Sequence, residues 1–246
     1  MINSELHKNP VALDRVQHKG LKIQLPLTDW SMAKGLNSYF IVTAEFGDLC
    51  KDFPIVFVRN GDDAANAPLE VAPVAVYGLQ PGENLFIKDG KWVGESMPAH
   101  MRAYPFATAK ISDEQYAICV DRAWAGFDND AGEALFDDKG EAAPFLDEIK
   151  TYLDNLEVET ERTRLICKRL VELDLMEPMR FDAQLDSGNL SVEGFFCISE
   201  TKFTALAGDV VAELHRNGIL GLVHAQHVSM GNMRRLVERR VRQAAA

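Results

Sequence analysis

The residues whose types could bind or transform a ligand are concentrated in one segment, residues 82–107, GENLFIKDGKWVGESMPAHMRAYPFA. An arginine in such a segment can hold a carboxylate through two parallel hydrogen bonds, and an aromatic ring next to it offers a rigid apolar wall. The segment therefore predicts a ligand-binding cleft. The competing interpretation is structural, with aromatic rings in the core and the arginine satisfying buried carbonyls. Glu45, which lies outside this segment, is a candidate ion-pair partner for Arg102. The candidate ligand-binding residues are therefore Glu45, Asn84, Trp92, His100, Arg102 and Tyr104.

Local signals fix where the backbone turns within this segment. Asp89-Gly90 between apolar flanks predicts a two-residue hairpin turn, because both central residues of a type I′ turn need positive φ. Pro98 can open a short helix, and Tyr104 is pushed out of helical φ/ψ by Pro105, which ends that helix. We therefore expect a strand, a turn, a second strand and a short helix in this order.

Two histidines near the C-terminus have the spacing of metal ligands on a helix. His224 and His227 are three residues apart, so their side chains would share one face. A helix-borne zinc protease would instead show His-Glu-x-x-His, with a Glu and four-residue spacing. The pair is a weak metal candidate, and structural histidines are the competing interpretation.

Residues 232–246 form a local basic patch, with five arginines and one glutamate. Such a cluster can complement the negative end of a terminal helix, or it can dock an acidic partner. The second possibility predicts a protein or peptide partner, and its candidate binding residues are Arg234, Arg235, Arg239 and Arg240.

Signatures of catalysis are weak or missing in the sequence. The run Asp128-Asn129-Asp130 resembles the opening of a calcium loop, but Glu133 and Lys139 stand where an EF-hand needs a glycine and a bidentate glutamate. No nucleotide-binding glycine loop and no G-x-S-x-G or S-x-x-K nucleophile motif occurs. We therefore expect no cofactor and name no catalytic residue.

Composition narrows the class of protein. Formal net charge is -11, which argues against a nucleic-acid binder, because phosphate neutralisation requires positive charge. The four cysteines are isolated and predict reduced, mostly buried thiols. No apolar run approaches the roughly 18 residues of a membrane span, and residues 1–20 contain no apolar signal core. These features predict a protein that does not span the membrane and stays in the cytoplasm.

The predicted fold class is α+β, because strand patterns come first and helical patterns later. We expect one domain over residues 1–246, mainly antiparallel β over 21–122 and mainly α with one β-hairpin over 144–246. Apolar residues at three- and four-residue steps predict a helix over 145–173, and the tail predicts one or two helices with a stop at Gly218. The predicted strands are LKIQLPL, FPIVFV, VAPVAVYGL, NLFIKDGKWVG, FATAKI, YAICVD, MRFDAQL and LSVEGFFCI.

Several passages resemble the SapC family of bacterial proteins, which is named for a component linked to surface-layer biology. They are PVALDRVQHKGLKI, LNSYFIVTAEF, FPIVFV, ENLFIKDGKWVGESMPAHMRAYPF, LFDDKGEAAPFL and GILGLVHAQHVSMGNMRRL. The resemblance implies a role in making, exporting or anchoring a surface layer, or in associated surface transport. Our first hypothesis is a soluble accessory or binding protein without enzymatic activity. Two alternatives stay open: an enzyme acting on a small molecule or peptide near His100, Arg102 and Tyr104, and an exported surface-layer structural protein.

Overall fold

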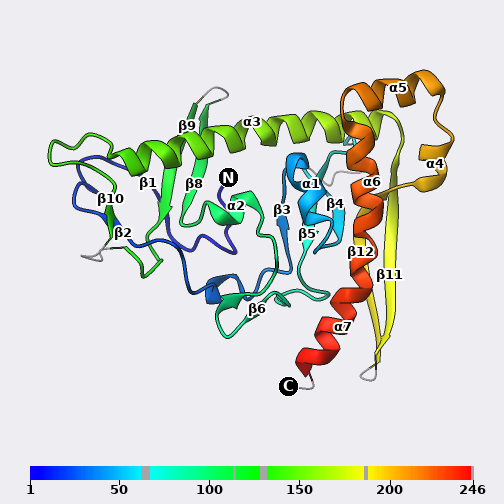
Figure 1. The fold of residues 1–246 in the computed structure, drawn as a ribbon, viewed down its shortest axis with the longest axis horizontal. Coiled ribbons are helices and arrows are strands. Elements are labelled where there is room, and N and C mark those ends of the chain that lie inside the picture. Colours follow the sequence, from blue (N-terminus) through cyan, green and yellow to red (C-terminus); the bar gives the residue numbers. More distant parts are fainter. Residues whose placement is uncertain (62–66, 113–114, 128–131, 186–187, 245–246) are drawn as a thin grey trace. The chain divides into compact units, whose positions relative to one another are not determined.

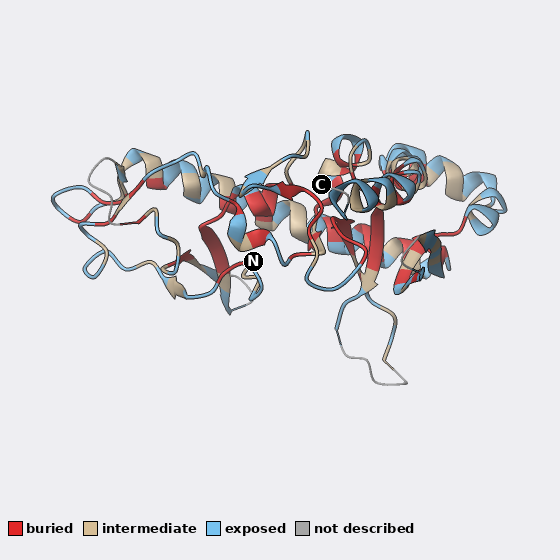
Figure 2. Ribbon diagram, turned by 90° about the horizontal axis from the view of Figure 1, so that it is seen from below, coloured by how far each residue is buried: buried red, intermediate tan, exposed pale blue. Residues whose placement is uncertain are grey.

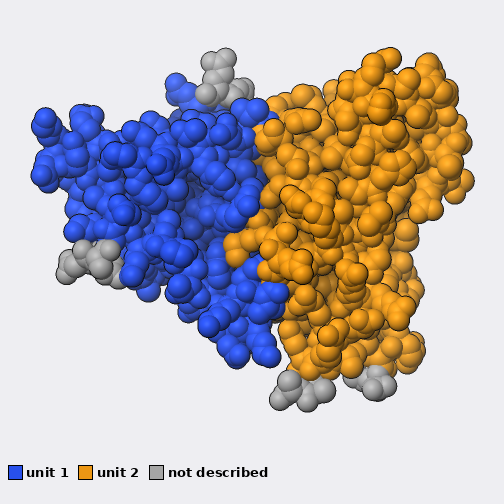
Figure 3. All heavy atoms as spheres, in the orientation of Figure 1, with its two compact units in different colours: residues 1–35, 87–93, 99–158 blue, residues 36–86, 94–98, 159–246 orange. Residues whose placement is uncertain are grey.

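The computed structural model describes residues 1–61, 67–112, 115–127, 132–185 and 188–244. Their contacts divide the chain into two compact units (Figure 3). Unit 1 comprises residues 1–35, 87–93 and 99–158, and unit 2 comprises residues 36–86, 94–98 and 159–246. We describe each unit by itself, and the single-domain organisation stays a prediction.

Unit 1 contains three small antiparallel sheets. The largest has the order β1-β9-β8, and two-stranded sheets are formed by β10 with β2 and by β6 with β7. Unit 1 also contains the short helical turns η1 (Ser31–Ala33) and α2 (Ala99–Arg102), and α2 connects β7 to β8. The strands are β1 (Pro10–Ala12), β2 (Lys22–Ile23), β6 (Ile87–Lys88), β7 (Lys91–Trp92), β8 (Phe106–Ser112), β9 (Gln115–Asp121) and β10 (Glu133–Ala134).

The core of unit 1 forms where helix and sheet side chains meet. Helix α3 (Pro144–Glu172) contributes Leu146, Leu153 and Leu156, whose spacing of three and seven residues keeps them on one face. Phe106 of β8 and Val120 of β9 pack in the same cluster, and both are almost fully buried. Figure 2 shows buried segments, in red, on both helices and strands. The apolar face of α3 therefore forms part of the core of unit 1.

The hairpin of β6 and β7 turns at the predicted residues. Asp89 and Gly90 have φ angles of 51° and 74°, and Ile87 pairs with Trp92 across the turn. A Cβ at position 90 would lie 2.7 Å from the Asp29 carboxylate, so the positive φ and the close neighbour both select glycine. Trp30 N–H donates to the Gly90 carbonyl at 2.6 Å and holds the turn in place.

Unit 2 is organised around one antiparallel sheet of order β11-β12-β4-β5-β3 (Figure 1). Helix α6 lies against this sheet, and α7 follows it along the chain. The strands are β3 (Ser38–Phe40), β4 (Ile55–Arg59), β5 (Val71–Val76), β11 (Met176–Leu185) and β12 (Gly188–Ile198). The helices are η2 (Thr43–Glu45), α1 (Phe46–Leu49), α4 (Glu200–Thr204), α5 (Gly208–Arg216), α6 (Ile219–Ser229) and α7 (Asn232–Ala244).

Aromatic rings fill the core of unit 2. The Phe53 ring lies 4.6 Å from the Phe86 ring and 5.4 Å from the Tyr77 ring, centroid to centroid. All three residues are fully buried. Such tilted and edge-on contacts are the geometries that aromatic quadrupoles prefer, so this cluster gives unit 2 a rigid centre.

The predicted α+β class is confirmed, with antiparallel sheets mainly in the N-terminal part and helices mainly in the C-terminal part. The hairpin of β11 and β12 lies at the expected position, although its turn residues 186–187 fall outside the described residues, as do 128–131 of the calcium-like run. None of the helices in the described part of the chain is both long and apolar enough to cross a bilayer.

Three local predictions were wrong in extent. NLFIKDGKWVG forms strands only at Ile87–Lys88 and Lys91–Trp92. LKIQLPL forms a strand only at Lys22–Ile23, and its Leu25-Pro26 bond is cis. Within its described residues, which end at 244, the tail forms four helices instead of one or two. The breaks lie at 205–207, at 217–218 and at 230–231, and Gly218 adopts the left-handed conformation that stops a helix as expected.

Candidate functional site

Helix α7 presents the basic patch, and its first residue anchors it to unit 2. The side-chain amide of Asn232 donates to the Cys50 carbonyl at 2.8 Å and to the Phe53 carbonyl at 3.1 Å. Met233 and Leu236 are buried on the inner face of the helix. The amphipathic pattern therefore leaves the arginines on the remaining faces.

Two of these arginines line a pocket of about 300 Å³ within unit 2. Arg235 and Arg239 are one helical turn apart, so they point to the same side of α7. Lys51, Asp52 and Glu95 contribute the other charged groups, while Phe86 and Leu236 form the apolar part of the wall. The pocket thus combines three cationic side chains with two carboxylates.

Contacts hold the two pocket arginines in place without an ion pair in the part of the chain that the structure describes. Arg235 Nη1 donates to the Lys51 carbonyl at 3.1 Å and to the Asn232 Oδ1 at 3.0 Å. The Arg239 guanidinium lies over the Phe86 ring, 4.3 Å from its centroid, in a cation–π contact. Both guanidinium groups therefore keep donors that could reach a ligand.

One carboxylate of the pocket already has a structural role. Asp52 Oδ2 accepts hydrogen bonds from Glu95 N–H at 2.6 Å and from Ser96 N–H at 3.2 Å, which ties residues 94–98 to the end of α1. Lys51 Nζ lies 2.8 Å from Asp48 Oδ1, and both side chains are exposed. Such an exposed pair is weak and leaves the lysine able to turn toward a ligand.

The other arginines of α7 are paired with glutamates. Arg234 and Arg242 both approach Glu238 of the same helix, at 3.3 and 3.6 Å, and Arg240 lies 3.4 Å from Glu83. Of the four candidate partner-binding residues, Arg235 and Arg239 line the pocket, whereas Arg234 and Arg240 lie in ion pairs. The role of all four in binding a partner stays a prediction.

The candidate ligand-binding residues are divided between the two units. Glu45 and Asn84 belong to unit 2, where Glu45 Oε2 accepts from Val42 N–H at 3.4 Å and the buried Asn84 Oδ1 accepts from Phe86 N–H at 2.9 Å. These bonds shape local turns. Their part in ligand binding stays untested.

Trp92, His100, Arg102 and Tyr104 belong to unit 1. Trp92 is half-buried on β7, Arg102 is exposed on α2, and His100 on the same helix is buried. Burial lowers the pKa of His100 to about 3, so the ring is neutral at pH 7. The short helix ends before the cis Tyr104-Pro105 bond, as the proline predicted.

Tyr104 takes part in a buried network that the sequence did not reveal. Its hydroxyl donates to Asp121 Oδ2 at 2.9 Å. The same carboxylate accepts backbone N–H bonds from Lys8 at 3.1 Å, from Asn9 at 2.7 Å and from Ala123 at 3.2 Å. Burial raises the pKa of Asp121, but these four hydrogen bonds outweigh it and hold the pKa below its usual range. Asp121 therefore fastens the N-terminal segment to the end of β9.

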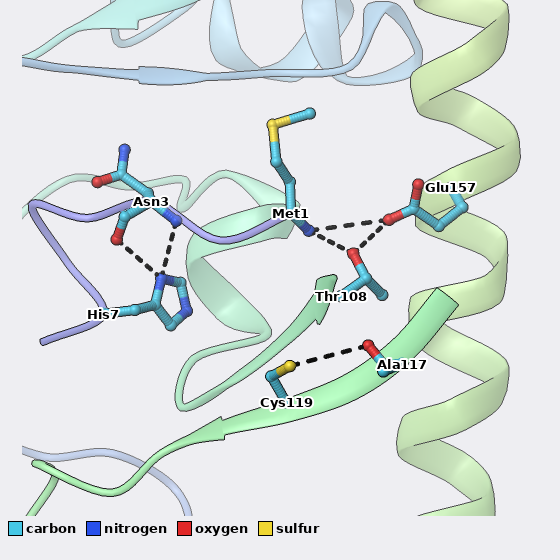
Figure 4. Close-up of polar contacts among 7 residues, drawn as sticks. All are labelled: Met1, Asn3, His7, Thr108, Ala117, Cys119 and Glu157. Carbon is cyan, nitrogen blue, oxygen red and sulfur yellow. Dashed lines mark hydrogen bonds and ion pairs between the residues drawn. The ribbon is translucent and has the colours of Figure 1, made fainter. Parts of the chain in front are cut away.

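A second cluster lies near the start of the chain (Figure 4). Met1 N lies 2.5 Å from Thr108 Oγ1 and 3.8 Å from Glu157 Oε1, and the Thr108 hydroxyl donates to the same glutamate. His7 Nδ1 lies 3.1 Å from the Asn3 N–H, and burial lowers the pKa of the His7 ring. No sequence motif predicted these contacts. Some of the partners are about 50 to 150 residues apart, and the others lie in a local turn without a recognisable signature.

The two candidate metal-binding histidines make different contacts in the structure. His227 Nε2 donates to the Ile198 carbonyl at 2.9 Å, whereas His224 is exposed and its ring lies 5.6 Å from that of Phe203. Among the described residues, no group of three or more His, Cys, Asp or Glu side chains is arranged to hold a metal ion.

Fold and site together define an α+β protein with a small basic pocket on its C-terminal helix. The SapC family model matches residues 13–236, which is most of the chain, and the protein therefore belongs to the SapC family. The matched range includes the pocket residues Lys51, Asp52, Phe86, Glu95 and Arg235 and ends before Arg239. No curated protein and no solved structure is significantly similar to the chain.

Proposed function

We propose that this SapC-family protein is a non-enzymatic binding protein that takes an acidic peptide segment of a partner protein into the pocket lined by Arg235, Arg239 and Lys51. The observation that carries the proposal is that two arginines one turn apart on α7 line the same pocket as a lysine. Guanidinium groups bind carboxylates bidentately, which makes paired arginines suited to glutamate or aspartate side chains.

Charge distribution supports an acidic ligand. Helix α7 carries five arginines and one glutamate, a net charge of +4, on a chain whose formal net charge is -11. A nucleic acid would meet the repulsion of the acidic remainder, whereas a short acidic peptide needs to contact only the basic helix. The carboxylates of Asp52 and Glu95 would reject a ligand whose negative charge is continuous and would favour spaced acidic side chains.

The test is fluorescence anisotropy with a labelled peptide of alternating glutamate and alanine, added to the full-length protein. The double variant Arg235→Ala/Arg239→Ala should weaken binding by at least about tenfold, which corresponds to about 1.4 kcal/mol. The double variant Arg234→Ala/Arg242→Ala is the matched control, since it removes the same charge from the same helix but no residue of the pocket.

The two variants separate the proposal from general charge attraction. If both doubles weaken binding equally, the peptide is attracted by the overall field of α7 and the pocket is not the site. Absence of saturable binding by the unmodified protein at low salt would reject the proposed function altogether.

The partner and the location belong to the same proposal. The family name supports a partner from surface-layer or surface-transport machinery, and the sequence predicts that the protein meets it in the cytoplasm. Fractionation of native cells tests this part: the protein should be recovered with the cytoplasm. Recovery from the extracellular fraction would favour the alternative of an exported surface-layer structural protein.

The alternative of an enzyme has its own test. It requires a turnover that depends on His100, Arg102 and Tyr104, whose side chains lie on or directly after α2. A reaction abolished by Arg102→Ala in a folded protein would favour the enzyme over the binding protein. Arg102 is the informative position, because its side chain is exposed.

A further inference from the structure

A second pocket of unit 2, separate from the basic pocket, brings two sulfur atoms together. Cys197 Sγ on β12 lies 3.6 Å from Met230 Sδ at the end of α6. Both residues line a pocket of about 320 Å³. Helix α6 packs along β12 in this part of the structure (Figure 1), so the pair joins two elements that are distant in sequence.

The neighbouring strand adds further donor atoms to the same pocket. Glu177 of β11 is directly opposite Cys197 in the antiparallel register, and Met179 lies two residues along. Residues two apart on a strand share one face of the sheet, and both of these side chains line the pocket. A third sulfur atom therefore lines the same pocket, and Met179 is exposed to solvent.

The hydrogen bond of His227 leaves one ring nitrogen available as a donor to a metal ion. Its Nε2 is 2.9 Å from the Ile198 carbonyl, and a carbonyl can only accept, so Nε2 carries the proton and the lone pair is on Nδ1. Histidines that bind metals usually donate their other ring N–H to such a carbonyl or carboxylate. His227 also lines this pocket and is one helical turn before Met230.

The donor set selects a soft metal ion. Thiolate and thioether ligands favour Cu(I), whereas Mg²⁺ and Ca²⁺ need oxygen ligands. Metal–sulfur bonds of about 2.3 Å at a tetrahedral angle would separate two sulfur atoms by about 3.8 Å, close to the 3.6 Å between Cys197 and Met230. We propose that Cys197, Met230 and His227 bind one monovalent soft metal ion, Cu(I) or its analogue Ag(I).

Binding is coupled to loss of one proton. The metal–sulfur bond at Cys197 forms as the S–H bond breaks, and the proton passes to the solvent, with no change in oxidation state.

The experiment titrates the full-length protein with Cu(I) under anaerobic conditions in competition with the chromophoric chelator bicinchoninate. The unmodified protein should withdraw one equivalent of Cu(I) from the chelator. Met230→Leu preserves side-chain volume and should lower the affinity at least about tenfold, and Cys197→Ala should lower it further. The matched controls are Cys50→Ala and Cys167→Ala, which remove thiols outside this pocket and should leave binding unchanged.

X-ray absorption of the loaded protein gives a readout that does not depend on the variants. It should show sulfur atoms at about 2.3 Å together with one lighter nitrogen ligand. The proposal is overturned if no Cu(I) is withdrawn, if Met230→Leu binds as tightly as the unmodified protein, or if Cys50→Ala alone abolishes uptake.

Discussion

Replacing Gln226 of helix α6 with leucine should strongly destabilise unit 2. The register of β12 on β4 pairs Phe196 with Phe57, and extending it by two residues sets Ile198 opposite Ile55. The fully buried Gln226 bridges that position: its Nε2 donates to the Ile55 carbonyl at 3.1 Å, and its Oε1 accepts from Ile198 N–H at 3.3 Å. The side chain therefore substitutes for a missing rung between the two strands.

The magnitude follows from the two backbone groups that the substitution leaves without a partner. Leucine matches the shape of glutamine approximately but offers neither donor nor acceptor, and both groups lie in residues that are almost fully buried. An unsatisfied buried polar group costs about 1–3 kcal/mol. Gln226→Leu should therefore lower the free energy of unfolding by about 2–6 kcal/mol.

The assay is urea denaturation followed by circular dichroism, at constant protein concentration. Val228→Ala is the matched control, because Val228 is on the same helix with 69% of its surface exposed and should change stability by less than about 0.5 kcal/mol. If Gln226→Leu unfolds at the same urea concentration as this control, the bridging role of Gln226 is wrong.

Three further predictions concern unit 1. The pKa of Asp121 is depressed in the folded protein, so its contribution to stability is present above its unfolded pKa of about 3.9 and is lost as pH falls through the folded value. In urea titrations, Asp121→Asn should be less stable than the unmodified protein at pH 7 and should lose less stability on acidification. An unchanged dependence of stability on acid pH would contradict this. Folding lowers the pKa of His100 from about 6.5 to about 3, so the free energy of unfolding should decrease below pH 6.5 by up to about 1.4 kcal/mol per pH unit. His100→Leu should make this dependence on pH less steep. An equally steep dependence in the variant would show that other groups cause it. Gly90→Ala should lower the midpoint of thermal unfolding through about 1–3 kcal/mol of strain, while Gly20→Ala, which has open space around it, should not; equal effects would refute the turn argument.

The parts of the fold that could be predicted depend on local signals. Asp89-Gly90 specifies its own turn, and the apolar steps over residues 145–173 specify a helix without help from the rest of the chain. The hairpin of β11 and β12 follows from alternation on either side of a turn signal. In each case the information lies within about 30 residues.

The unpredicted parts depend on contacts between distant residues. Asp121 meets Asn9 across 112 positions, and Gln226 meets Ile55 across 171. The basic pocket joins Lys51 to Arg235 across 184 positions, so the sequence could identify the arginines as a basic patch but could not identify what faces them. The tail was predicted as one or two helices because its breaks at 205–207 and 230–231 do not interrupt the apolar pattern.

The central claim is that the pocket arginines bind acidic side chains, and NMR of the arginine side chains tests it most directly. Titration of ¹⁵N-labelled protein with the glutamate–alanine peptide should shift the Nε–H signals of Arg235 and Arg239 in a saturable manner. The signals of Arg234 and Arg242, which are paired with Glu238 outside the pocket, should stay in place. Saturable shifts of Arg234 and Arg242 while Arg235 and Arg239 do not move would contradict the account.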